Sequence, residues 1–239
     1  ENKGYNAGNN VGIAKALELK CDAILISNND VCFERGCIQE LYDCAQKNPQ
    51  IGIAGPKILD RDGKIQKSNL CRKTGMKEKY LVRTRLNAIF RHSYKTYFGF
   101  DRNYDTMYEV YAVLGCCFLM TRACAETVTP LDEHPFLYEE ELILGITMEK
   151  AGFRTVYDPA AVIEHLHGGS TQHVRAFSFA HNVRSEIYYC REYLHASKWK
   201  MLPLYWYRVM LYLLRCVKYE DFRKQWKWFR KMTKEELRK

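Results

Sequence analysis

The stretch AILISNND, residues 23–30, decides the fold. Its apolar first part can form a buried strand, and it ends abruptly in two amides and a carboxylate, Asn28, Asn29 and Asp30. Upstream, a run of turn-forming residues passes into a helix that we expect over residues 11–20. Helix, short turn and apolar strand in this order are the rhythm of an α/β protein.

The alternation of helix and strand continues along the chain. The next expected elements are helices over residues 35–48 and 138–153 and strands over 51–59, 108–122 and 154–166. In the last of these, Asp158-Pro159 predicts a break between two short strands. Residues 71–108 are rich in Lys, Arg and Tyr without a clean period, so we expect an irregular excursion there.

Composition limits the classes of protein that the chain can be. It has 239 residues, 47% of them hydrophobic, which is ample for one domain with a real core. Mean hydropathy is −0.41, and no run of 18 uncharged apolar residues predicts a membrane span. The ten cysteines show no C-x-x-C pair, which favours a reducing, cytosolic context over the alternative of a zinc site.

The positive charge is concentrated at one end. The net charge is +9, and residues 181–239 alone hold 15 Lys and Arg against six Asp and Glu. Aromatic residues alternate with these cations, which suits a helix in the headgroup region of an anionic membrane. The alternative is that the aromatics pack on the rest of the protein or on a second subunit. Failure to bind anionic vesicles at physiological salt would exclude the membrane interpretation.

Asn28, Asn29 and Asp30 stand where open α/β sheets bind ligands, beyond the carboxyl end of a strand. A carboxylate there can hold Mg²⁺, which prefers one or two protein carboxylates together with substrate phosphates. The alternative is an ordinary turn after a strand.

Two further clusters carry groups suited to chemistry. FLYEEEL, residues 136–142, places Glu139, Glu140 and Glu141 at the start of a helix, where they either cap it or supply a general base. In VIEHLHGGST, residues 162–171, His165 and His167 alternate along a strand that two glycines end. Both imidazoles could face one side, for a structural role or for binding a metal or phosphate.

Five segments in order make the chain resemble a family 2 glycosyltransferase of the GT-A type. They are ENKGYNAGNNVGIAKAL (1–17), AILISNND (23–30), GPKILDRDGKIQ (55–66), GCCFLMTR (115–122) and FLYEEELILGITMEKAGFRTVYDPAAVIEHLHGGST (136–171). More narrowly, the chain is similar to rhamnosyltransferase-like bacterial enzymes of polysaccharide biosynthesis in the cell envelope. Relatives carry two more strands before the first segment, so we expect an incomplete donor pocket and weak activity or none from this chain alone.

The resemblance implies roles for particular residues. Glu141 takes the position of the catalytic base, with Glu140 as the alternative. The metal site for Mg²⁺ or Mn²⁺ falls on Asp30 and His165, with His167 the weaker candidate. The positions assigned to the donor are Gly8, Asn9, Asn28 and Asn29.

The resemblance also implies a function and an architecture. We expect a mixed sheet flanked by helices in residues 1–175 and a basic, aromatic helical region in 176–239. The expected reaction moves a sugar, with inversion, from a nucleotide-diphosphate donor to a hydroxyl of a glycan or lipid-linked acceptor. Expected partners are these substrates, an anionic membrane surface and a second copy in a homodimer. We expect a cytoplasmic protein able to lie on the inner face of the membrane.

Other functions fit the sequence less well. A nucleotidyltransferase would need a Gly-rich phosphate loop, which is not seen in this chain. Nucleic acid bound by the basic residues 181–239 would bring its phosphates near the acidic clusters of residues 1–180, which would repel them. We therefore expect no nucleic-acid partner. A non-catalytic glycosyltransferase remnant stays open.

Overall fold

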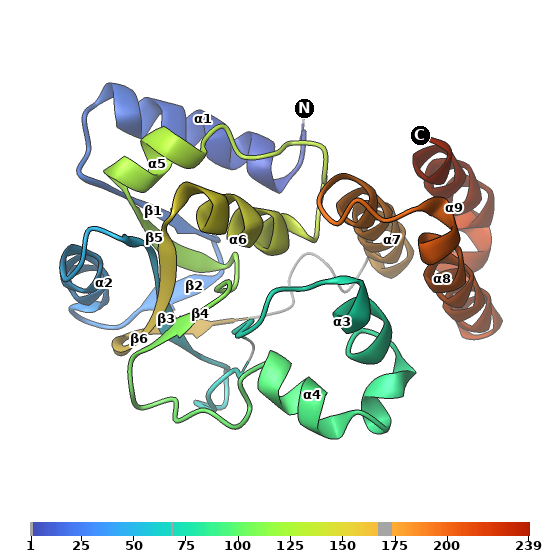
Figure 1. The fold of residues 1–239 in the computed structure, drawn as a ribbon, viewed down its shortest axis with the longest axis horizontal. Coiled ribbons are helices and arrows are strands. Elements are labelled where there is room, and N and C mark those ends of the chain that lie inside the picture. Colours follow the sequence, from blue (N-terminus) through green and yellow to red (C-terminus); the bar gives the residue numbers. More distant parts are fainter. Residues whose placement is uncertain (1, 68, 167–173) are drawn as a thin grey trace.

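The computed structural model describes residues 2–67, 69–166 and 174–239 (Figure 1). Within these residues, a six-stranded sheet has the order β1-β5-β3-β6-β2, and β4 also pairs with β6. The strands are β1 (Ala23–Ser27), β2 (Val31–Phe33), β3 (Ile51–Leu59), β4 (Tyr108–Val110), β5 (Cys117–Thr121) and β6 (Arg154–His165). Only β3 and β6 run parallel among these pairings, so the predicted mixed α/β sheet is confirmed.

Helices cover both faces of the sheet and extend beyond it (Figure 1). They are α1 (Tyr5–Glu18), α2 (Cys37–Gln46), α3 (Met76–Leu81), the 3₁₀ helix η1 (Arg85–Ala88), α4 (Arg91–Tyr97), α5 (Arg122–Val128), α6 (Glu140–Ala151), α7 (Arg175–Glu192), α8 (Lys198–Lys218) and α9 (Glu220–Arg238). Helix α2 packs on one face, whereas α1, α5 and α6 lie over the other.

The alternation of side chains along the central strands builds two cores. In β5, Phe118 and Met120 join the cluster under α1, α5 and α6, while Cys117 and Leu119 join the cluster under α2. Neighbouring residues of a strand point to opposite faces, so a strand that is apolar throughout must be covered on both sides. This explains why the apolar runs of the sequence show no polar alternation.

Three local predictions were wrong in detail. The first helix begins at Tyr5 instead of residue 11, because Asn6 and Asn10 donate side-chain hydrogen bonds to the carbonyls of Asp132 (2.7 Å) and Leu131 (2.9 Å). These tertiary contacts override the turn preference of the segment.

Within residues 154–166, one long strand, β6 (Arg154–His165), forms instead of two short ones. A shift in its register with β3, between Pro56 and Lys57, takes up the residues around Pro159. Residues 71–108 contain α3, η1 and α4, so the irregular excursion is partly ordered into short helices.

The C-terminal region forms its own packed unit of α7, α8 and α9 beside the sheet domain (Figure 1). Tyr212, Phe222 and Phe229 are buried at its centre, so many of the aromatics pack inside the protein. Helix α7 also packs against α6, through Tyr189 and Cys190. In the part of the chain that the structure describes, no helix is long and apolar enough to cross a membrane. The domain boundary near residue 175 stays a prediction.

Candidate active site

The first polar cluster connects strands that stand at opposite ends of the sheet order. After β1, the Asn28 N–H donates to the carbonyl of Cys116 (2.8 Å), and the chain then enters β2. There Val31 lies opposite His165 of β6, and the Leu166 N–H donates to the Asp30 carbonyl (3.0 Å). This pairing brings the Asp30 carboxylate oxygen Oδ1 to 3.3 Å from His165 Nε2.

One cavity joins this edge of the sheet to the acidic cluster. It has a volume of about 290 Å³. Its walls include polar residues from all three clusters: Asn28 after β1, His165 at the end of β6, and Glu140 and Glu141 at the start of α6. The remaining lining residues are Tyr5, Gln66, Leu114, Gly115, Cys116, Leu137 and Tyr138. Residues far apart in the sequence therefore face a single space.

Glu141 is held in this cavity by the backbone of Gly115. The Gly115 N–H donates to Glu141 Oε1 (3.1 Å), and the Tyr5 hydroxyl donates to the Gly115 carbonyl. A Cβ at residue 115 would lie 3.0 Å from Glu141 Oε1 and 3.2 Å from the Tyr5 hydroxyl. The absence of a side chain at Gly115 thus allows the Glu141 carboxylate and the Tyr5 hydroxyl to approach the backbone of this residue together.

Glu139 has a different environment from its two neighbours. It is buried and accepts hydrogen bonds from the Lys79 ammonium at 2.7 and 2.6 Å. Tyr138 and Glu139 both have left-handed backbones, with φ of 73° and 72°. Such a conformation is unfavourable for residues with a Cβ and persists where the surroundings impose it. The ion pair is one such constraint and leaves Glu140 and Glu141 as the carboxylates of the cavity.

The site raises the affinity of both carboxylates for protons. Burial, followed by the charge of Glu141, raises the pKa of Glu140 from 4.5 to about 8. Burial also raises the pKa of Glu141, against the hydrogen bond from Gly115 that lowers it. Desolvation is the leading cause for both groups, with like-charge repulsion second for Glu140. A base of raised pKa is better matched to removing a proton from a hydroxyl near neutral pH.

These pKa directions predict a pH-dependent stability. Between about pH 4.5 and 8, Glu140 is protonated in the fold but ionised in the unfolded chain, so rising pH favours unfolding. We expect Glu140→Gln to flatten this decline and to raise the free energy of unfolding at pH 8.5 by about 1–3 kcal/mol, the usual cost of a buried unsatisfied group. Urea denaturation at pH 6 and 8.5 measures it, with the exposed Glu149→Gln as control. Equal pH slopes for Glu140→Gln and the unmodified protein would contradict the assignment.

Four predicted site residues, Gly8, Asn9, Asn29 and Asp30, are not among the residues that line this cavity. Asn29 and Gly8 are exposed, and Asn9 lies within α1, so their donor-binding roles stay predictions. His167 lies outside the described residues. Across residues 2–67, 69–166 and 174–239, no group of three or more His, Cys, Asp or Glu could hold a metal ion. Asp30 and His165 are in contact as a pair, and their role as metal ligands stays a prediction.

Sequence reasoning missed three residues that shape this site. Tyr5 and Gly115 lie inside the family-like segments 1–17 and 115–122, but the sequence assigns them no role. Lys79 lies in residues 71–108, which show no clear period. The one available signal was the glycine before Cys116, at the start of an apolar strand. The Lys79–Glu139 pair joins residues 60 positions apart, which no local pattern indicates.

Comparison with known proteins gives this geometry a context. No family model matches the chain. It is 29% identical over 218 residues to an N-acetylglucosaminyl-diphospho-decaprenol L-rhamnosyltransferase of Mycobacterium tuberculosis, covering 86% of this chain and 68% of the relative. The chain is a relative of glycosyltransferases. The resemblance drawn from the sequence motifs and the enzyme class that it implied are thereby confirmed.

Two more distant likenesses cover less of the other protein. A low-salt glycan biosynthesis hexosyltransferase of Haloferax volcanii is 28% identical over 148 residues, 59% of this chain and 41% of the relative. The crystal structure of GalNAc-T7 with UDP, GalNAc and Mn²⁺ gives a TM-score of 0.48 at 14% identity. It covers 70% of this chain, which spans 31% of that protein.

Proposed function

We propose that this glycosyltransferase relative moves a sugar, with inversion, from a nucleoside-diphosphate donor to a hydroxyl of a lipid-linked glycan. The observation that carries the proposal is the shared cavity of Asn28, Glu140, Glu141 and His165, with Asp30 in contact with His165. The name of the mycobacterial relative supports the sugar and acceptor class, since that protein is a rhamnosyltransferase acting on a diphospho-decaprenol carrier. A rhamnosyl donor is therefore the first to test.

In this proposal, Glu141 removes the proton from the acceptor hydroxyl. Its carboxylate lines the cavity, and the Gly115 N–H fixes one of its oxygens. Glu140 lines the same cavity, and its Oε1 has no hydrogen-bond partner among the described residues, so it remains the alternative base. The hydroxyl then attacks the anomeric carbon from the face opposite the leaving nucleotide. Asn28 is positioned to donate to an oxygen of the donor.

Asp30 and His165 have the chemistry of a site for Mg²⁺ or Mn²⁺ that substrate oxygens complete. A carboxylate oxygen and an imidazole nitrogen lie 3.3 Å apart, and the Asp30 side chain is 36% exposed and open to a further partner. Such cations are commonly held by few protein groups together with phosphates. When bound, a divalent cation stabilises the negative charge on a leaving diphosphate.

Binding of the donor tests this assignment. We expect nucleoside-diphosphate sugars to bind in the presence of Mn²⁺, and Asp30→Asn to weaken that binding at least about tenfold, as the loss of one charge-assisted contact of about 1.4 kcal/mol does. Titration calorimetry with and without Mn²⁺ measures it. The exposed Asp22→Asn, before β1, is the matched control. Donor binding that ignores both Mn²⁺ and Asp30→Asn would overturn the metal site.

The membrane and homodimer partners stay predictions. One feature supports the membrane surface: α8 exposes large apolar side chains at helical spacing. They are Trp199, Trp206, Met210, Leu213, Leu214 and Val217. The sequence also predicts that aromatic residues of this region pack on the protein. Tyr205 and Phe229 do so, since both are buried in the cluster of α7, α8 and α9. A basic region with this apolar face suits an anionic lipid surface.

A further inference from the structure

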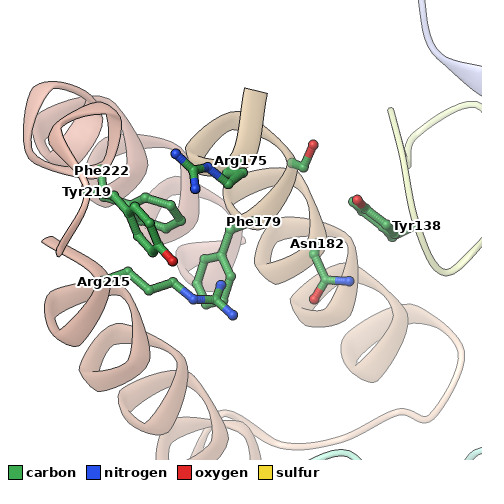
Figure 2. A pocket seen from close by; sticks show the side chains of 8 residues that line it. Tyr138, Arg175, Phe179, Asn182, Arg215, Tyr219 and Phe222 are labelled. Atoms are coloured by element: carbon green, nitrogen blue, oxygen red, sulfur yellow. The ribbon is translucent and has the colours of Figure 1, made fainter. Parts of the chain in front are cut away.

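A second, larger cavity opens among the C-terminal helices (Figure 2). Its volume is about 670 Å³. The lining residues come from α7, α8, the start of α9 and the loop before α6: Arg175, Ser178, Phe179, Asn182, Arg215, Tyr219, Phe222 and Tyr138. No carboxylate is among these residues, so the only formal charges on its described walls are two arginines.

Both arginines are unpaired with acids among the described residues. Arg175 lies over the ring of Tyr219 (4.2 Å), and Arg215 extends from α8 over the ring of Phe179 (4.3 Å; Figure 2). Arg208, two turns earlier on α8, shows the contrast, because Glu186 binds it at 2.7 Å. Burial lowers the pKa of Arg215 from its usual value. Two guanidinium groups fixed on aromatic rings without an anion suit a ligand that brings its own negative charge.

The wall that α7 contributes to this cavity offers further polar groups. Ser178 is 8% exposed, and its hydroxyl has no hydrogen-bond partner among the described residues. The amide of Asn182 lies one helical turn further along α7 (Figure 2). Buried hydroxyls are normally satisfied, so an unpartnered one in a cavity wall points to a ligand or to water there. Ser178 and Asn182 can both donate to phosphate oxygens.

Tyr138 connects this cavity to the candidate active site. It lines both cavities, and its left-handed backbone immediately precedes the three glutamates. The two cavities therefore share one lining residue, and it is next to the glutamates in the chain. The rings of Phe179, Tyr219 and Phe222 add apolar walls to this anion-binding surface.

We propose that this cavity binds the diphosphate of an amphiphilic acceptor, a sugar linked through diphosphate to a prenyl chain. The proposal rests on the proposed function, in which the donor diphosphate lies at the Asp30–His165 pair, where His165 also lines the other cavity. The acceptor would then lie with its diphosphate between the arginines and its sugar hydroxyl toward Glu141. The aromatic walls and the exposed apolar face of α8 suit its prenyl chain.

Binding of short probes tests the proposal without the natural acceptor. We expect farnesyl diphosphate to bind more tightly than inorganic pyrophosphate in titration calorimetry, because the apolar chain adds buried area. Arg175→Gln and Arg215→Gln should each weaken binding of farnesyl diphosphate at least about tenfold, the effect of losing one charged hydrogen bond. The matched control is Arg230→Gln, because Arg230 is an exposed arginine over Trp226 on α9 and does not line the cavity.

The outcomes separate this proposal from the proposed function. Unchanged affinity in both variants, or no binding of farnesyl diphosphate to the unmodified protein, would overturn the acceptor cavity. Pyrophosphate binding as tight as farnesyl diphosphate would assign the cavity to a free phosphate and also overturn it. Donor binding with Mn²⁺ is measured on the same variants and should not change. Loss of donor binding in both Arg175→Gln and Arg215→Gln would assign this cavity to the donor and overturn the proposal. Absence of donor binding in the unmodified protein would contradict the proposed function alone.

Discussion

Glu141→Gln is expected to lower the rate of sugar transfer by about 10²–10⁴, the contribution typical of a general base. The change keeps the shape of the side chain, and its amide oxygen can still accept the Gly115 N–H. It removes the ability to take a proton from the acceptor hydroxyl. Because donor contacts are unaffected, we expect the affinity for the donor to stay the same. Release of nucleoside diphosphate from a panel of donor sugars, rhamnosyl donors included, measures the rate.

The pH profile and two companion variants identify the base. The base must be ionised, and burial raises the pKa of Glu141, so the rate should rise with pH on the acidic side. Glu149→Gln changes an exposed carboxylate of the same helix and should leave the rate unchanged. A full rate for Glu141→Gln, with loss in Glu140→Gln, would move the base to Glu140. Full rates in both would exclude this acidic cluster from proton transfer.

The convergence of distant polar residues followed from a general rule about sheets. Asn28 and Asp30 end one strand and His165 ends another, and ligands of open α/β sheets lie beyond such ends. In this mixed sheet, the pairing of β2 with β6 is what sets Asp30 beside His165. Applying this rule requires only apolar runs and the polar residues that follow them, and both can be recognised in one sequence.

The residues that hold the glutamates of the site make contacts that have no local signature in the sequence. The sequence predicts a turn at Tyr5, but a helix forms there because Asn6 and Asn10 donate hydrogen bonds to the carbonyls of residues 132 and 131. The cavity lined by Arg175 and Arg215 is assembled by side chains of α7, α8, the start of α9 and the loop before α6. In the sequence, these three helices look like ordinary basic, aromatic helices. Nothing in the residues 71–108 distinguishes Lys79 from the other cations of that segment. Such groups become visible only when tertiary packing is known.

Lys79 offers the largest expected effect on stability. Its side chain is fully buried, and although burial favours the neutral amine, the carboxylates of Glu139 and Glu186 raise its pKa. Glu186 in turn is bonded by Arg208 at 2.7 and 2.8 Å. These four residues tie α3, α7 and α8 to the residue before α6. We expect Lys79→Met to lower the free energy of unfolding by about 3–5 kcal/mol, because it leaves the Glu139 charge buried without its partner.

Matched variants distinguish the buried Lys79–Glu139 pair from an exposed ion pair. Lys73→Met breaks an exposed pair with Glu149 and should cost less than about 1 kcal/mol. Lys79→Met combined with Glu139→Gln removes both charges, so it should recover a large part of the loss in a urea melt. A loss under 1 kcal/mol for Lys79→Met, or no recovery in the double variant, would contradict the role of the pair.

The same variants test whether the buried pair also positions Glu140 and Glu141, the proposed bases. Glu139 is the left-handed residue directly before Glu140 and Glu141, and its ion pair is one of the contacts that impose this conformation. The stability-recovered double variant should therefore still transfer sugar more slowly than the unmodified protein, by about tenfold, since small displacements of a catalytic group are costly. Its donor affinity should be unchanged. A full rate in the folded double variant would limit Lys79 and Glu139 to holding the helices together.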